Sequence, residues 1–163
     1  MEFGELNKLD IKKREIKKVI IHCSDSEFGD AALIDRWHKE RGWKGIGYHF
    51  VILNGCRKAT ATGFQPYKKE DDGLIQQGRA VEVVGAHCEG ENHDSIGICL
   101  IGREHYSAKQ LYVSLPNLLR DIFFGHGIVS GQVFGHYEFN PQKTCPNIDM
   151  AILKEYINKI FNK

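Results

Sequence analysis

The strongest constraint on the fold is a continuous apolar run in the second half of the chain, Ser95–Gly102 (SIGICLIG). Such a run indicates a strand buried on both faces, because a strand with one solvated face would alternate apolar and polar side chains. The segment Lys17–Cys23 (KKVIIHC) has a similar β-branched core. Strands buried on both faces need a covering layer on each side, so both runs favour a sheet between helices.

The remaining sequence supplies further strands and the covering helices. Three segments have apolar residues at every third or fourth position, which predicts amphipathic helices, and Asp30 is placed to cap the first of them. Helices are expected over 31–41, 107–125 and 149–161, and further strands over 47–53, 74–78 and 129–136. Strands that alternate with helices predict a single α/β domain, with a central mixed β-sheet flanked by about three helices.

Two details of the middle of the chain can be predicted. Within strand 47–53, alternation of faces groups Tyr48 with Phe50 and Ile52. Residues 54–69 mix glycine, proline and charged residues, so we expect a long excursion between strands.

Composition excludes several classes of protein. The chain of 163 residues is 42% apolar and 26% charged, which is typical of a globular domain with its own core. Its net charge of +1 gives no reason to expect nucleic acid as a partner, and no apolar run is long enough for membrane insertion. Residues 1–16 are polar and charged, so we expect an N-terminal arm without a signal peptide, a domain over 17–163, and synthesis in the cytoplasm.

One histidine–cysteine stretch indicates a metal site. Cys145 is one of five irregularly spaced cysteines, and it follows His136 after a turn at Asn140-Pro141. His22 and His136 each end a predicted strand. Strands that end at one edge of a sheet bring such side chains together, and two imidazoles and a thiolate are donors that Zn²⁺ prefers. The alternative is a satisfied or surface histidine and a small buried cysteine.

Two further side chains suit a hydrolysis. Tyr48 can exchange a proton with a water molecule on the metal, and Lys143 is a cation that could stabilise the oxyanion of a tetrahedral intermediate. Taken singly, Tyr48 could be a strand aromatic that packs under the first helix, and Lys143 a solvated loop residue. These alternatives stay open on the residues alone.

Several motifs appear in a fixed order along the chain. They are VIIHCS (19–24), WHKERGW (37–43), GYHF (47–50), GAHC (85–88), NHDSIGICL (92–100), GH (135–136) and KTCP (143–146). In this order they resemble the zinc-dependent N-acetylmuramoyl-L-alanine amidases of the phage lysozyme and peptidoglycan-recognition-protein family. The resemblance covers nearly the whole chain, and an ordered set of motifs is more specific than any single one.

The resemblance implies a zinc hydrolase that cuts the amide bond between N-acetylmuramic acid and L-alanine of peptidoglycan, as a phage or prophage endolysin does. The residues that match the family's functional positions are the zinc ligands His22, His136 and Cys145, the catalytic Tyr48, Lys143 beside the metal, and His87 in the substrate groove. An endolysin without a signal peptide would reach the cell wall through a holin, and a cytoplasmic muropeptide-recycling enzyme is the alternative. We expect a monomer.

Three rival interpretations follow from the same resemblance. The chain could be a recognition module that binds muropeptide without cutting it. It could also inhibit a phage RNA polymerase, for which residues 1–18 would be the responsible segment. The zinc could be purely structural, with Cys23 or His87 as a fourth ligand. The excursion 54–69 departs from the family pattern and could reshape one wall of the substrate groove.

Overall fold

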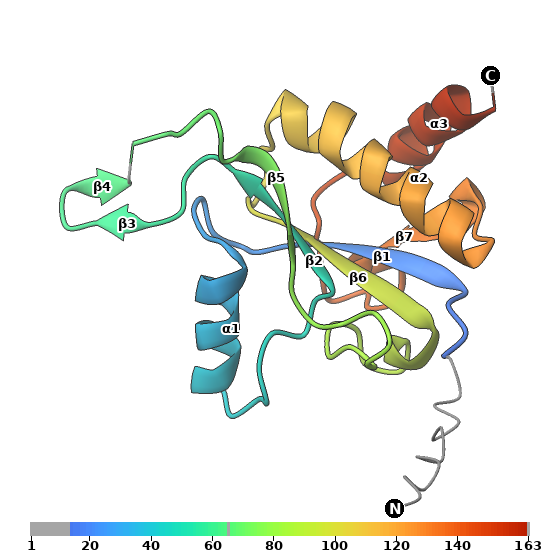
Figure 1. Ribbon diagram of the computed structural model, residues 1–163, viewed down its shortest axis with the longest axis horizontal. Coiled ribbons are helices and arrows are strands. Elements are labelled where there is room, and N and C mark those ends of the chain that lie inside the picture. Colours follow the sequence, from blue (N-terminus) through green and yellow to red (C-terminus); the bar gives the residue numbers. More distant parts are fainter. Residues whose placement is uncertain (1–13, 65, 163) are drawn as a thin grey trace, which may run out of the picture.

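A five-stranded mixed sheet lies at the centre of the structure (Figure 1). The computed structural model describes residues 14–64 and 66–162. Its elements are β1 Lys18–Cys23, α1 Ala31–Glu40, β2 Phe50–Asn54, β3 Ala59–Thr60, β4 Gly63–Phe64, β5 Asp72–Gln77, β6 Ser95–Leu100, α2 Leu115–His126, β7 Val133–Gly135 and α3 Met150–Phe161. The strand order is β5-β2-β6-β1-β7, and only β5 runs antiparallel to its neighbour. The predicted α/β fold with a mixed sheet and three helices is confirmed.

Different helices cover the two faces of the sheet. α2 and α3 pack on one face, over alternate residues of the central strands that include Val19, Ile21 and Ile98. α1 packs on the other face, where Ile34 joins a cluster with Val51. In Figure 1, α1 lies below the sheet and α2 and α3 lie above it. All six residues of β6 are buried between these layers, which explains why that strand lacks polar alternation.

Tyr48 lies on the opposite face from the one predicted. β2 begins only at Phe50, and Tyr48 packs against the cluster beneath α1, whereas Phe50 and Ile52 pack beneath α2. The chain is crowded at Gly47, where a Cβ atom would lie 2.1 Å from the carbonyl oxygen of Ala86. Regular alternation of side chains begins only after this close contact between Gly47 and Ala86. The predicted alternation from residue 47 was therefore wrong.

The long helix predicted in the second half of the chain contains a π-helical turn. The helical run from residue 108 continues through a π-helical turn, Gln110–Ser114, into α2, and Pro116 lies in the first turn of α2. The buried Gln110 side chain donates from Nε2 to the carbonyl oxygens of Ile52 (3.0 Å) and Ile101 (2.9 Å). This amide ties the start of the helix to the ends of two central strands.

The predicted excursion contains the short hairpin β3–β4, which projects at the left of Figure 1. Arg57 at its base forms ion pairs with Asp30 (3.3 Å) and Asp71 (2.7 Å). Asp30 also caps α1, because its carboxylate accepts the N–H of Leu33 at 2.9 Å. The base of the excursion is therefore fixed to the starts of α1 and β5.

The predicted N-terminal arm, and with it the segment considered for RNA polymerase inhibition, falls mostly outside the described residues. Of its described part, Ile16 packs into the core beneath α2 and α3. The Arg14 guanidinium donates to the carbonyl oxygens of Val81 (2.8 Å) and Ser95 (2.9 Å), and it also reaches Asn92 (3.0 Å). Among the described residues, no helix combines the length and apolar character needed to span a membrane.

Replacing a central isoleucine tests this arrangement. Ile98→Ala should lower the free energy of unfolding by about 2–5 kcal/mol, because Ile98 is fully buried and its truncation leaves a cavity. Ile152 of α3 is 66% exposed and provides the matched control, so Ile152→Ala should change the value by less than about 0.5 kcal/mol. Denaturant unfolding measures both, and equal losses would contradict the placement of Ile98.

Candidate metal centre

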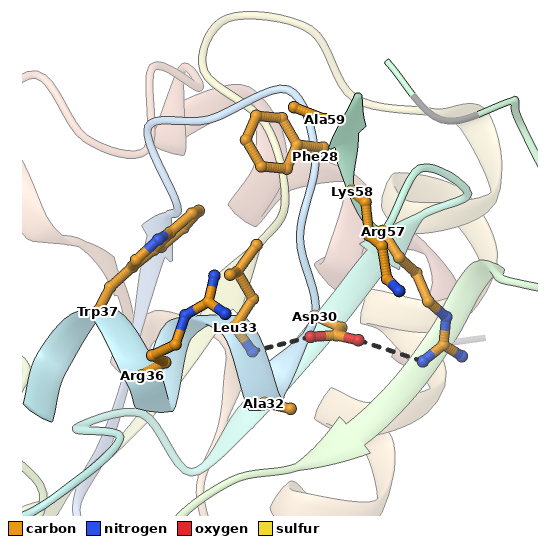
Figure 2. Close-up of a pocket in the computed structure, with 9 residues that line it drawn as sticks. All are labelled: Phe28, Asp30, Ala32, Leu33, Arg36, Trp37, Arg57, Lys58 and Ala59. Carbon is orange, nitrogen blue, oxygen red and sulfur yellow. Dashed lines mark hydrogen bonds and ion pairs between the residues drawn. The ribbon is translucent and has the colours of Figure 1, made fainter. Parts of the chain in front are cut away.

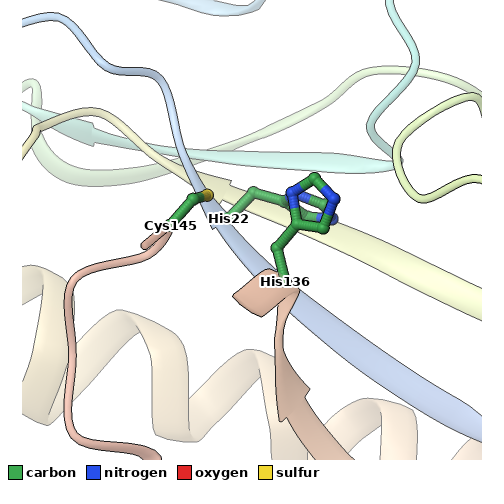
Figure 3. A group of neighbouring side chains, drawn as sticks. All are labelled: His22, His136 and Cys145. Atoms are coloured by element: carbon green, nitrogen blue, oxygen red, sulfur yellow. The ribbon is translucent and has the colours of Figure 1, made fainter. Parts of the chain in front are cut away.

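Three side chains from two strand ends and one loop converge at one edge of the sheet (Figure 3). Ile21 of β1 pairs with Gly135 of β7, so the next residues, His22 and His136, stand side by side. Their ring centroids are 4.6 Å apart. One potential ligand atom from each of His22, His136 and Cys145 lies within 4.8 Å of the other two. The structure thus brings the three predicted metal ligands together.

Backbone hydrogen bonds fix the cysteine loop against the sheet. The N–H of Cys23 donates to Sγ of Cys145 at 3.0 Å, and the N–H of Tyr137 donates to the Cys145 carbonyl oxygen, also at 3.0 Å. The predicted turn after the second histidine is present, since the N–H of Asn140 donates to the carbonyl oxygen of His136. The loop therefore returns the thiol to the strand that carries the first histidine.

Burial sets the charge state of the three side chains. It holds the pKa of His22 well below the usual 6.5, and together with the nearby Lys143 cation it lowers the pKa of His136. Both rings are neutral at pH 7, which is the form that binds metal. The hydrogen bond with the Cys23 side chain, followed by burial, raises the pKa of the Cys145 thiol. A metal ion has to displace that proton as it binds.

The donor set fits Zn²⁺. Two imidazole nitrogens and one thiolate sulfur are ligand types that zinc prefers. Within the described part of the chain, neither Cys23 nor His87 joins the group as a fourth ligand. Instead, Nδ1 of His87 lies 2.9 Å from Nε2 of His22. Three protein ligands with a fourth position open to another group are the pattern of a catalytic zinc site rather than a structural one.

Two of the three ligands, His136 and Cys145, line a cleft of about 400 Å³, and His22 is buried behind it. Both predicted catalytic side chains, Tyr48 and Lys143, line the same cleft. His38 at the end of α1 and the following Arg41 and Trp43 complete one side of it. A substrate group in this cleft can therefore contact the metal group and both predicted catalytic side chains together.

Tyr48 and Lys143 stand in different surroundings. The Tyr48 ring lies 5.0 Å from the His22 ring, and burial raises the pKa of its phenol well above 10. The Tyr48 hydroxyl therefore stays protonated at pH 7 and can donate a hydrogen bond. Lys143 is exposed and forms no ion pair with any residue that the structure describes. Its ammonium group is consequently available to an anionic or partly negative substrate atom.

His87 also lines the cleft, as the resemblance implied, but only 8% of its surface is exposed. Burial lowers the pKa of His87 to about 3, so the ring is neutral. Its two nitrogens both face protein groups: Nδ1 faces His22, and Nε2 lies 3.3 Å from Oγ of Ser95.

A second cavity of about 580 Å³ lies beside α1 and the base of the excursion (Figure 2). Phe28 and Trp37 line it, with ring centroids 6.0 Å apart, and so do Arg57 and Lys58. No metal-binding group of described residues borders this cavity. Of the excursion, Arg57, Lys58 and Ala59 line this second cavity, and none of its described residues lines the cleft around the metal group. That the excursion reshapes another part of the substrate groove stays a prediction.

Comparison with known proteins agrees with this geometry. The sequence profile of the family described as N-acetylmuramoyl-L-alanine amidase matches residues 12–148. The chain belongs to this amidase family. The endolysin of Escherichia phage T7 is 32% identical over 156 residues, covering 88% of this chain and 89% of the relative.

Solved structures of amidase-family relatives have the same fold. The N-acetylmuramoyl-L-alanine amidase LysC from Clostridium intestinale URNW superposes with a TM-score of 0.72 at 26% identity, covering 92% of this chain and 87% of that one. A mutant of Drosophila PGRP-LB in complex with tracheal cytotoxin gives a TM-score of 0.63 at 27% identity, covering 81% and 75%.

Sequence reasoning missed two supporting contacts of this amidase-family site. The N–H of Cys23 that holds Cys145 is a backbone group, and no side-chain pattern could have indicated it. The contact between Ser95 and His87 was not predicted either, although both residues belong to motifs on which the family resemblance depends.

Buried histidines should make the metal-free protein sensitive to acid. Burial lowers the pKa of His38 and of His49 to about 4, whereas both titrate near 6.5 in an unfolded chain. Between these values the unfolded state binds more protons, so the free energy of unfolding should decrease as the pH falls, by up to about 1.4 kcal/mol per pH unit for each histidine. Denaturant unfolding at several pH values measures this slope. His38→Gln should make it shallower, and an unchanged slope would rule out this origin.

Proposed function

We propose that this protein is a zinc-dependent N-acetylmuramoyl-L-alanine amidase that separates the stem peptide from the glycan of peptidoglycan. The observation that carries the proposal is a three-ligand group of zinc-preferring donors, two of which line a cleft that Tyr48 and Lys143 also line. Membership of the amidase family and a relative that is an endolysin support the same reaction.

Different residues of the chain have different roles in the hydrolysis. His22, His136 and Cys145 would hold a zinc ion, which would supply Lewis acidity and lower the pKa of a water molecule. The Lys143 cation stabilises the negative charge that develops on the scissile carbonyl oxygen. The Tyr48 hydroxyl, which is protonated at pH 7, assists proton transfer to the nitrogen of L-alanine, which must gain a proton to leave as an amine.

A module that binds muropeptide without cutting it is the main alternative. Its cleft would need recognition groups but no metal-binding thiol beside two imidazoles. The complete set of three ligands, with Cys145 fixed by the N–H of Cys23, therefore favours the enzyme. Binding of peptidoglycan fragments is common to both, and the PGRP-LB relative was solved with tracheal cytotoxin.

We further propose that the enzyme works as a lysin. The endolysins of Escherichia phage T7 and Klebsiella phage KP32 are both similar to it over more than four fifths of its length. An enzyme of this kind acts on the cell wall, and passage from the cytoplasm through a holin would give it access to its substrate.

Loss of the thiolate ligand should abolish metal binding and catalysis together. Cys145→Ser replaces it with a hydroxyl group that binds zinc poorly. The native protein should carry about one zinc per chain and release new L-alanine amino termini from peptidoglycan, whereas the variant should fold but do neither. Elemental analysis and an amino-terminus assay measure the two properties.

The matched control is Cys56→Ser, because Cys56 lies outside the metal group and should keep both zinc and activity. A native protein that holds no zinc and stays inactive after zinc is added would overturn the proposal. The family fold would then support only recognition of peptidoglycan.

The tyrosine can be tested without disturbing the metal. Tyr48→Phe removes only the hydroxyl, so zinc content should be unchanged while kcat falls by about 10²–10⁴-fold. Tyr112→Phe, at a residue that is 59% exposed on the opposite side of the sheet, should leave both values as in the native protein. Steady-state kinetics on purified muropeptide checks this, and a kcat within a few-fold of native would remove Tyr48 from the proton transfer.

A further inference from the structure

A chain of hydrogen bonds leads from one metal ligand into the interior of the domain. Nε2 of His22 lies 2.9 Å from Nδ1 of His87, whose Nε2 lies 3.3 Å from Oγ of Ser95. The Ser95 hydroxyl in turn donates to the carbonyl oxygen of Glu91 at 2.7 Å. We propose that His87 is a positioning residue, which acts through this chain to present Nδ1 of His22 to the metal. The inference rests on the zinc site proposed above.

The last member of the chain fixes its direction. The Glu91 carbonyl oxygen can only accept a hydrogen bond, so the Ser95 hydroxyl donates its single hydrogen to that oxygen. Oγ of Ser95 can then only accept from Nε2 of His87. Only 8% of the His87 surface is exposed, where an unpaired charge would be costly, so the ring carries a single hydrogen. With that hydrogen on Nε2, the ring accepts at Nδ1, and Nε2 of His22 must be the donor. The remaining lone pair of His22 is therefore on Nδ1.

The surrounding backbone holds His87 in one orientation. A Cβ atom on Gly85 or on Gly97 would lie 2.5 or 2.6 Å from the His87 ring, so only glycine leaves room for the ring at these two positions. The N–H of His87 donates to Oδ1 of Asn92 at 2.9 Å. The ring cannot turn without displacing backbone on both sides, and this rigidity passes to His22 through their shared hydrogen bond.

This arrangement explains how a ligand can be oriented before metal arrives. Metal-binding histidines generally donate their second ring N–H to a fixed acceptor, which sets the tautomer and raises the basicity of the ligand nitrogen. A carboxylate or a carbonyl oxygen usually takes this role. Here a buried neutral imidazole takes it, and it adds no negative charge to the site.

Metal affinity provides the first test. His87→Phe keeps a planar ring but removes the acceptor, so zinc affinity, measured by competition with a chromogenic chelator, should fall by about 10–100-fold. His87→Asn places a side-chain carbonyl oxygen near the position of Nδ1 and should restore much of the affinity. Ser95→Ala should cause a smaller loss than His87→Phe. His93→Gln, at a histidine outside both the metal group and the cleft, should bind zinc as the native protein does.

The ring tautomers provide the second test, on the native protein alone. Long-range ¹H–¹⁵N correlation spectra of the metal-free protein should show the hydrogen on Nε2 of both His22 and His87. A hydrogen on Nδ1 of His22 would overturn the proposal. So would a zinc affinity for His87→Phe and Ser95→Ala equal to the native value, even if His87→Phe lowers activity by altering the substrate groove.

These outcomes are separate from those of the proposed function. If native protein cleaves peptidoglycan but His87 variants bind zinc normally, the positioning role fails and the amidase stands. If native protein binds zinc with the predicted tautomers but cleaves nothing, the amidase proposal fails and the positioning role stands.

Discussion

The parallel pairing of β1 with both of its neighbours is the constraint on which the rest of the structure depends. On one side, the register with β7 places His22 next to His136. On the other, the register with β6 sets Ile20 opposite Gly97, which makes room for the His87 ring. A slip of β1 by one residue would turn His22 to the opposite face, beneath α2. His22 would then lose both its place beside His136 and its contact with His87.

The loops around the cleft contain strained backbone conformations at residues other than glycine. Among the described residues, Asp25 (φ 55°) and Asn147 (φ 58°) are the two that adopt a positive φ without being glycine, and both line the metal cleft. Asn147 is held there, since its Nδ2 donates to the carbonyl oxygen of Arg103 at 2.7 Å. Such conformations persist only where surrounding contacts fix them, and they concentrate at functional sites. The stability of the sheet and of the core beneath α2 and α3 offsets the free-energy cost of these two strained backbone conformations.

The sequence predicted the fold because its signals were local and strong. The runs around Ile20 and Ile98 could only be buried strands, and the helices followed from their periodicity. The meeting of His22, His136 and Cys145 was also predictable, from strand ends and a turn. The face of Tyr48 was not, because the crossing of Gly47 with Ala86 involves residues far apart in the sequence.

Two other features lay beyond the sequence for related reasons. The π-helical turn before α2 depends on the burial of Gln110 against strand ends that only the folded sheet provides. The partner of His22 in the interior depends on a loop, 85–95, that is held by the Asn92 side chain and by the hydrogen bond from the N–H of Ala86 to the carbonyl oxygen of Gly47. The second contact joins backbone groups far apart in the sequence, so no pattern of side chains reveals it.

The anchoring of Arg14 has a consequence for where this domain begins. Its guanidinium holds the carbonyl oxygens of Val81 and Ser95, at the two ends of the segment that carries His87. A shortened chain starting at Lys17 would retain every side chain of the motifs and yet lose the hydrogen bonds that Arg14 makes to this segment. The functional unit therefore extends upstream of its first motif, and a minimal version of the protein has to be cut before Arg14 rather than at the first strand.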